Sequence, residues 1–260
     1  METAAHRLEV ALRHIAPVPR DALALTECAA VGNPAGTAAA AASSAPIPTQ
    51  EPGRAERKDA LKWNGWGYAD TKFTLDKEGS AYLTGDRYMF AGQKLPYLRS
   101  FMESVVGIDM NVQTPATATL VVPPANINGA FIKELEGKVD KIATDDKDRL
   151  FHSHGHTAQE IFQLRYGKLD RVVDAVVYPG CHAHCEAIVK AAKQHNVCLI
   201  PFGGGTSVSQ ALLIPETETR MVVSVDMCHM NKILWIDRTA MVVRMETGAI
   251  GVDIQRMLEK

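Results

Sequence analysis

The sequence lacks any long hydrophobic segment: no apolar run approaches the roughly 18 residues that indicate a transmembrane helix. It also lacks an excess of charge, since 28 Lys and Arg face 30 Asp and Glu, and so has no basic field that would favour nucleic acid. Cysteine is scarce, with five among 260 residues. An odd, sparse set does not predict a disulfide framework and favours a reducing compartment. The rest of the composition, 46% hydrophobic and 22% charged, is that of a soluble globular protein.

Lysine is missing where a nucleotide triphosphate site would need it. Residues 201–209 contain three consecutive glycines after a short apolar run, which predicts a loop whose backbone N–H groups converge on an anion. A Walker phosphate loop is excluded because no Lys lies between Lys193 and Lys232. A dinucleotide fingerprint needs a third glycine where Val208 stands, and residues 210–215 are too short for its helix. The alternative is a plain glycine-rich turn between two strands.

Strand and helix patterns alternate in the second half of the chain. Residues 172–178 predict a β-branched strand, residues 182–195 a helix, and residues 197–201 a second strand. This order predicts a βαβ unit with a parallel pair of strands that leads directly into the glycine loop. Further elements are predicted as strands at 221–225, 233–237 and 241–246 and as a helix at 248–260.

The first half is less regular. Residues 29–53 are mostly Ala, Pro, Gly, Ser and Thr, which predicts a linker or a disordered tract. Residues 62–68 gather two Trp and a Tyr, a pattern that on its own predicts an aromatic cluster at a domain edge. Short helices are predicted at residues 95–106, 131–135 and 157–165.

The strand–helix–strand unit and its glycine loop resemble the flavin-binding domain of the vanillyl-alcohol oxidase type. Several stretches in the same order resemble, within that superfamily, the alkylglycerone-phosphate synthases: residues 62–68, 154–156, 160–162, 203–209 and 230–235. The resemblance covers residues 59–260. It implies an α+β fold, with an N-terminal helical region followed by the first α/β subdomain of a PCMH-type FAD-binding domain. It also implies FAD as the cofactor, with its pyrophosphate held by Pro201, Phe202, Gly203, Gly204, Gly205, Thr206 and Ser207.

The resemblance implies an enzyme of ether lipid biosynthesis. Such an enzyme exchanges the acyl chain of 1-acyl-dihydroxyacetone phosphate for a long-chain fatty alcohol, using FAD without net redox change. The catalytic residues are expected beyond Lys260, so the chain is expected to be a truncated form without the second flavin subdomain and the substrate cap. The alternatives are a PCMH-type FAD-dependent 2-hydroxy-acid dehydrogenase or oxidase, and a non-catalytic fragment that pairs with the full-length enzyme.

The N-terminus resembles a peroxisomal import signal. Arg7 and Leu8, followed after five residues by His14, match its bipartite pattern and imply recognition by the import receptor. Removal after Cys28 is expected. The predicted organisation is a presequence at 1–28, a linker at 29–58, a family-specific region at 59–169 and an incomplete FAD-binding domain at 170–260. The resemblance further implies a homodimer, peripheral to the lumenal face of the peroxisomal membrane.

Two clusters of potential metal ligands in the sequence also have structural interpretations. Cys181 and Cys185 share one helix face, whereas His182 and His184 point elsewhere, so no metal site is predicted. Three alternating histidines would lie on one face of an extended strand, where a structural role is favoured; they are His152, His154 and His156. Arg165 could steer a phosphate, but a surface salt bridge is the favoured expectation. Asp226 and Glu246 end predicted strands and need no catalytic role.

Overall fold

The structure is a computed structural model that describes residues 47–48, 57–112, 114–115, 119 and 121–259. The expected import signal at Arg7, Leu8 and His14, the expected cleavage after Cys28 and most of the expected linker lie outside the described residues. Within the described ranges, no helix has the length and apolar character needed to cross a membrane.

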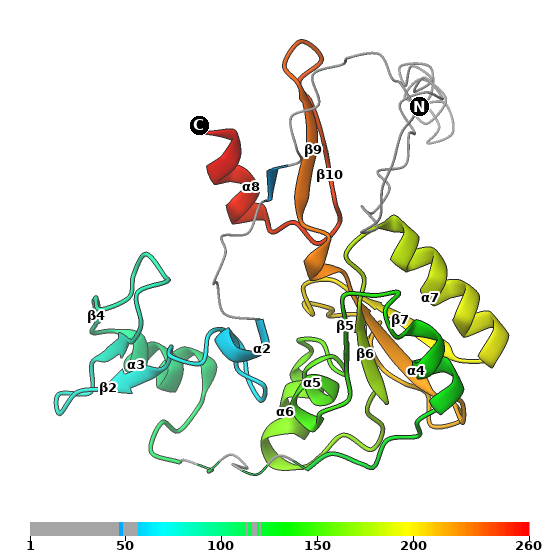
Figure 1. Cartoon of the computed structure of the whole chain (residues 1–260). Coiled ribbons are helices and arrows are strands. Elements are labelled where there is room, and N and C mark those ends of the chain that lie inside the picture. The colour runs from blue at the N-terminus through cyan, green and yellow to red at the C-terminus, as the bar shows by residue number, and fades with distance from the viewer. Residues whose placement is uncertain (1–46, 49–56, 113, 116–118, 120, 260) are drawn as a thin grey trace, which may run out of the picture.

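A four-stranded sheet forms the centre of the C-terminal half (Figure 1). Its order is β5 (Lys141–Ala143), β6 (Ala175–Tyr178), β8 (Val222–Asp226) and β7 (Cys198–Phe202). β8 pairs in parallel with both of its neighbours, and β5 runs antiparallel at the edge. Every residue of β6 and β8 is buried, as expected for parallel strands covered on both faces.

The predicted βαβ unit is present, but its two strands do not pair with each other. Helix α7 (His182–His195) has the predicted bounds and connects β6 to β7. The parallel pair expected between them is wrong, because β8 lies between the two strands. β8 is buried at all five positions, whereas β7 is partly exposed along most of its length. The strand that is buried at every position thus lies at the centre of the sheet, and β7 lies at its edge.

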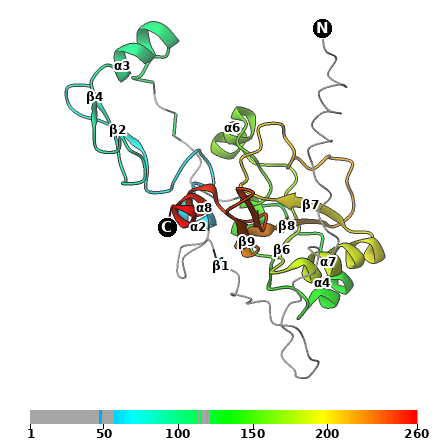
Figure 2. The same ribbon diagram turned by 90° about the horizontal axis from the view of Figure 1, so that it is seen from above.

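Helices cover both faces of this sheet (Figures 1 and 2). On one face, α4 (Gly129–Leu135) and α7 form the largest core cluster with the side chains of β6 and β8. On the other, α5 (Asp146–Phe151) lies against β6, and α6 (Ala158–Tyr166) packs on α5 through Leu150, Ile161 and Leu164. The predicted helices at 131–135 and 157–165 are confirmed, and α5 was not predicted.

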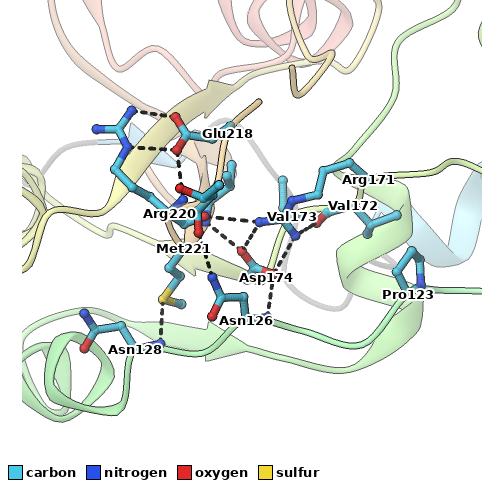
Figure 3. A network of polar contacts seen from close by, with 12 residues as sticks. Pro123, Asn126, Asn128, Arg171, Val172, Val173, Asp174, Glu218, Arg220 and Met221 are labelled. Carbon is cyan, nitrogen blue, oxygen red and sulfur yellow. Dashed lines mark hydrogen bonds and ion pairs between the residues drawn. The ribbon is translucent and has the colours of Figure 1, made fainter. Parts of the chain in front are cut away.

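A polar network joins the amino ends of β6 and β8 to the incoming chain (Figure 3). The carboxylate of Asp174 is fully buried. Arg171 donates to its two oxygens at 2.7 and 2.8 Å, and the backbone N–H groups of Asn126 and Val222 donate to them at 2.8 Å each. Asp174 thus fixes the end of the sheet opposite to the glycine loop.

A smaller antiparallel sheet lies apart from the main one (Figures 1 and 2). It consists of β2 (Phe73–Leu75), β3 (Ala81–Leu83) and β4 (Lys94–Leu95), and the short helix α2 (Arg57–Ala60) precedes it. After it, α3 (Leu98–Phe101) continues as the π-helical turn η2 (Met102–Val106) and ends at Gly107. The helix predicted at 95–106 therefore exists, with a later start.

The chain ends in a hairpin and a helix. β9 (Lys232–Asp237) pairs with β10 (Val242–Met245) and with β1 (Ile47–Pro48). The 3₁₀ turn η3 (Met227–His229) links β8 to the hairpin, and α8 (Gly251–Leu258) follows it. The three strands and the helix predicted after residue 220 are all confirmed.

Candidate cofactor site

The glycine loop, residues 203–209, leaves β7 at the carboxyl edge of the parallel strands. β6 and β8 end at the same edge, at Tyr178 and Asp226. Ligands of open α/β sheets bind outside this edge. The predicted cofactor residues therefore lie where the sheet topology favours a ligand.

The main chain of this loop is available to a ligand. The N–H groups of residues 204–209 donate no hydrogen bond to any described residue, and most of the loop is exposed. Free N–H groups of successive loop residues form a site for an anion. The hydroxyl of Ser207 accepts a hydrogen bond from the N–H of Ala211 at 3.1 Å, so this side chain also closes the loop.

Two of the glycines have distinct reasons to be glycine. Gly205 has a φ of +68°, and a Cβ there would lie 2.7 Å from Cζ of Phe202. A Cβ at Gly203 would meet no atom within 4 Å. Gly205 is therefore required by the loop itself, whereas Gly203 leaves open space in which a ligand can approach the main chain.

A second segment, residues 154–157, holds the loop from the side. The N–H of His156 donates to the carbonyl of Ser207 at 2.7 Å. A Cβ at Gly155 would lie 2.3 Å from the same carbonyl oxygen. The indole N–H of Trp66 donates to the carbonyl of His156 at 3.1 Å. The aromatic run at 62–68 thus touches the segment that supports the loop.

Glu160 fixes this supporting segment. Thr157 caps α6 in a capping box with Glu160, and the Glu160 carboxylate also accepts from the N–H of Gly155 at 2.9 Å. Burial alone would raise the pKa of Glu160, but the hydrogen bonds from Thr157 and Gly155 outweigh it and lower the pKa. The carboxylate is therefore held in its charged form. The Thr-x-x-Glu spacing at 157–160 is a signal that sequence analysis could have used to find it.

A buried histidine lies beneath the loop. The His152 ring is 4.4 Å from the ring of Phe202, centroid to centroid. Its Nε2 is 2.8 Å from Oδ2 of Asp226 and its Nδ1 2.7 Å from the carbonyl of Asp148. Both ring nitrogens therefore lie within hydrogen-bonding distance of an oxygen of the chain. Asp226, which needed no catalytic explanation in the sequence, positions a histidine that packs under the loop.

The three alternating histidines do not lie on an extended strand, so that expectation is wrong. Asp145 is the N-cap of α5, and His152 is its C-cap. The other two histidines follow in the loop after this helix. His152 and His154 are buried and His156 is half-buried. Burial lowers the pKa of His154, and its Nε2 has no hydrogen-bond partner among the described residues.

The cysteine and histidine cluster at the start of α7 has structural partners. His182 Nε2 lies 3.1 Å from Glu186, and His184 Nδ1 accepts from the N–H of Gly180 at 3.1 Å. Cys181 is disulfide-bonded, a single bond that the scarcity of cysteine did not predict, whereas Cys185 is a free thiol. In the part of the chain that the structure describes, no three His, Cys, Asp or Glu side chains are placed to hold a metal ion.

Comparisons with known proteins agree with this geometry. Residues 173–260 match the family model of an FAD binding domain. A curated alkyldihydroxyacetonephosphate synthase from Caenorhabditis elegans is 39% identical over 206 residues, which cover 78% of this chain and 34% of that protein. The chain is similar in sequence to three curated alkyldihydroxyacetonephosphate synthases and to a solved one.

Structural similarity covers the same share of the chain. A solved alkyldihydroxyacetonephosphate synthase superposes with a TM-score of 0.70 at 29% identity, covering 78% of this chain and 39% of that one. The chain thus spans about a third of the length of the curated relatives it matches. A D-lactate dehydrogenase [cytochrome] from Arabidopsis thaliana is 26% identical over 46% of the chain.

These matches confirm the resemblance, the α+β fold with part of an FAD-binding domain, and FAD as the cofactor. The glycine loop fits such a group. Its N–H groups at 204–209 face no acceptor of the described chain, and the space beside Gly203 is open. A diphosphate needs several donors that can approach closely, and this loop provides them.

Proposed function

We propose that this chain carries the flavin-binding loop of an alkylglycerone-phosphate synthase. Such an enzyme exchanges the acyl chain of 1-acyl-dihydroxyacetone phosphate for a long-chain fatty alcohol, without net redox change. The observation that carries the proposal is the glycine loop, whose N–H groups at residues 204–209 donate to no described residue and which lies inside an FAD binding domain of a chain similar to the synthases.

The residues of this chain would bind and orient. The N–H groups of residues 204–207 would hold the pyrophosphate of FAD, and the hydroxyl of Thr206 would add a donor. Gly155 and Glu160 keep the loop in the shape that presents those donors. Bound FAD would supply the covalent chemistry at the carbon that exchanges its oxygen substituent. The acid–base groups and the cation for the substrate phosphate are proposed to lie in parts of such an enzyme that this chain does not span.

The setting of this function is also proposed from the sequence. The Arg7, Leu8 and His14 pattern supports import into the peroxisome through its receptor, with a site of action at the lumenal face of the membrane. A homodimer with peripheral membrane association belongs to the same proposal. Import is measured by fusing residues 1–28 to a fluorescent protein: peroxisomal fluorescence that Arg7→Ala abolishes is expected, and a cytosolic signal from the unchanged fusion contradicts it.

A chimera tests the proposal, because the relative supplies the parts of the enzyme that this chain does not span. Residues 59–260 replace the homologous third of the Caenorhabditis elegans synthase, and conversion of labelled fatty alcohol into alkyl-dihydroxyacetone phosphate is measured. We expect FAD-dependent exchange, which Gly203→Val abolishes because its side chain fills the open space beside the loop. The matched control is Thr219→Val, at an exposed position near the opposite end of the sheet, and should leave exchange unchanged.

The same chimera separates the competing functions. Similarity to a D-lactate dehydrogenase gives the oxidoreductase alternative a specific expectation: 2-hydroxy acids would bleach the flavin absorbance, with net electron transfer. Bleaching of this kind without exchange would replace the proposal. A folded chimera that binds FAD but makes no alkyl product would instead support a non-catalytic role for this chain.

A further inference from the structure

A second loop of the chain also presents free backbone donors. Residues 62–67 are closed by the bridge between Leu61 and Tyr68 and by a hydrogen bond from the N–H of Lys62 to the carbonyl of Gly67, at 3.0 Å. The N–H groups of residues 63 and 65–67 donate to no described residue. This loop therefore offers main-chain donors to an anion.

Two cations lie against this loop. A Cβ built at Gly65 would be 3.3 Å from Cδ of Lys62 and 3.9 Å from Nη1 of Arg165, so the two side chains approach the same point. Both residues are half-buried. Burial and the nearby Arg165 lower the pKa of Lys62, and Asp70 acts in the opposite direction.

Among the residues that the structure describes, no carboxylate forms an ion pair with either cation. The surface salt bridge expected for Arg165 is wrong: among the described residues, neither Arg165 nor Lys62 has an acidic partner within 4.0 Å. Asp70, the carboxylate close enough to influence Lys62, forms its ion pair with Arg87 at 3.5 Å. Two like charges held together without a counter-charge repel each other, and an anion between them removes that repulsion.

We propose that the loop of residues 62–67, together with Arg165, forms a second anion site, and that its ligand is a phosphate group. A phosphate dianion matches two cations in charge, and its oxygens match the fork of a guanidinium and the free N–H groups of the loop. This site is distinct from the glycine loop. The two are connected through His156, which accepts from the Trp66 indole and donates to Ser207.

Tryptophan fluorescence of the 260-residue chain reports on this site directly. Two of the three tryptophans, Trp63 and Trp66, belong to the loop, and the third is Trp235 in β9. Inorganic phosphate is titrated at constant ionic strength, with chloride as the reference anion. We expect a saturable change with phosphate and none with chloride, and Trp66→Phe should remove most of the change.

Charge-removing variants identify the ligands. Lys62→Met and Arg165→Met should each weaken phosphate binding by about tenfold or more, the usual effect of losing one hydrogen bond to a charged group. The matched control is Lys168→Met, which removes an exposed charge three residues after Arg165 and should bind as the unchanged chain does. Circular dichroism and thermal unfolding establish that each variant folds. In phosphate-free buffer, Lys62→Met should be at least as stable as the unchanged chain, because a repulsion is removed.

Dihydroxyacetone phosphate, a phosphate monoester, is titrated in parallel with inorganic phosphate. Binding of the monoester about tenfold tighter than inorganic phosphate identifies a phosphorylated metabolite as the ligand, and equal binding identifies free phosphate. The proposal is overturned by a response that does not saturate, by equal effects of phosphate and chloride, or by Lys62→Met and Arg165→Met variants that bind like Lys168→Met. It is also overturned if Lys62→Met or Arg165→Met unfolds the chain. Such a result would mean that the lost cation is already paired with an anionic group that the fold needs.

Discussion

Gly155→Ala is the most direct test of what holds the glycine loop in its conformation. The new Cβ would lie 2.3 Å from the carbonyl oxygen of Ser207 and 2.9 Å from its Cβ. Ser207 must therefore retreat by about 1 Å to reach ordinary contact distance. That movement breaks the hydrogen bond from the N–H of His156, now 2.7 Å long. The change does not touch the ligand, so any effect on FAD acts through the loop.

The magnitude follows from the contact that is lost. Losing a hydrogen bond at a buried site costs roughly 1–3 kcal/mol, which corresponds to a factor of roughly 5–150 in an equilibrium constant. We expect Gly155→Ala to weaken FAD binding by about tenfold to a hundredfold and to lower the free energy of unfolding by about 1–3 kcal/mol. FAD binding is measured by quenching of flavin fluorescence, and stability by urea unfolding.

Gly129→Ala is the matched control. Gly129 begins α4, and a Cβ there would meet no atom within 4 Å. This variant should bind FAD normally and unfold at the same or a slightly higher urea concentration, because Ala favours a helix over Gly. Gly155→Ala protein that is folded and binds FAD as tightly as the control would refute the role given to the 154–157 segment.

Other predictions concern stability. Asp174→Ala leaves the Arg171 guanidinium without its carboxylate and should cost about 3–5 kcal/mol in urea unfolding, whereas Glu216→Ala at an exposed site should change little; equal midpoints would contradict this. His154 is held neutral by burial, so its folded pKa is below its unfolded value. The unfolded chain then binds more protons below about pH 6.5, and stability should fall as the pH decreases from there. His154→Gln should flatten that decrease, and an unchanged slope would assign it to other groups. Glu160→Ala should cost about 1–2 kcal/mol through loss of the capping box and should also weaken FAD binding; normal FAD affinity would restrict Glu160 to capping.

The local elements of the second half could be predicted because their signals are local. α7 has the bounds that its spacing predicts, and it ends where Asn196 takes a left-handed conformation with φ of 54°. The glycine loop could be recognised because consecutive glycines directly after a predicted strand are visible in the sequence, and glycine is the residue that adopts a positive φ most readily. Such features depend on a few neighbouring residues, and the sequence shows those residues directly.

The order of the strands could not be predicted in the same way. Pairing of β8 between β6 and β7 depends on which strand is best buried on both faces, a property of the whole sheet. α5 was missed because Asp and Lys dominate its first turn and His152 follows it, a pattern that does not show an apolar stripe. Its N-cap Asp145, whose side chain accepts from the N–H of Asp148, is the local signal that sequence analysis could have used.

The part of the chain that holds the loop begins before the stretch that matches the FAD binding domain. The match starts at residue 173. However, β5, which precedes that residue, pairs with β6. Gly155 and His152 also precede it, and they contact Ser207 and Phe202 of the loop region. Because His152 also bonds to Asp226 at the end of β8, one side chain connects the two strands that meet at the loop. The geometry of the loop N–H groups that we propose to bind the cofactor is therefore set jointly by the matched domain and by residues 141–160, which precede it.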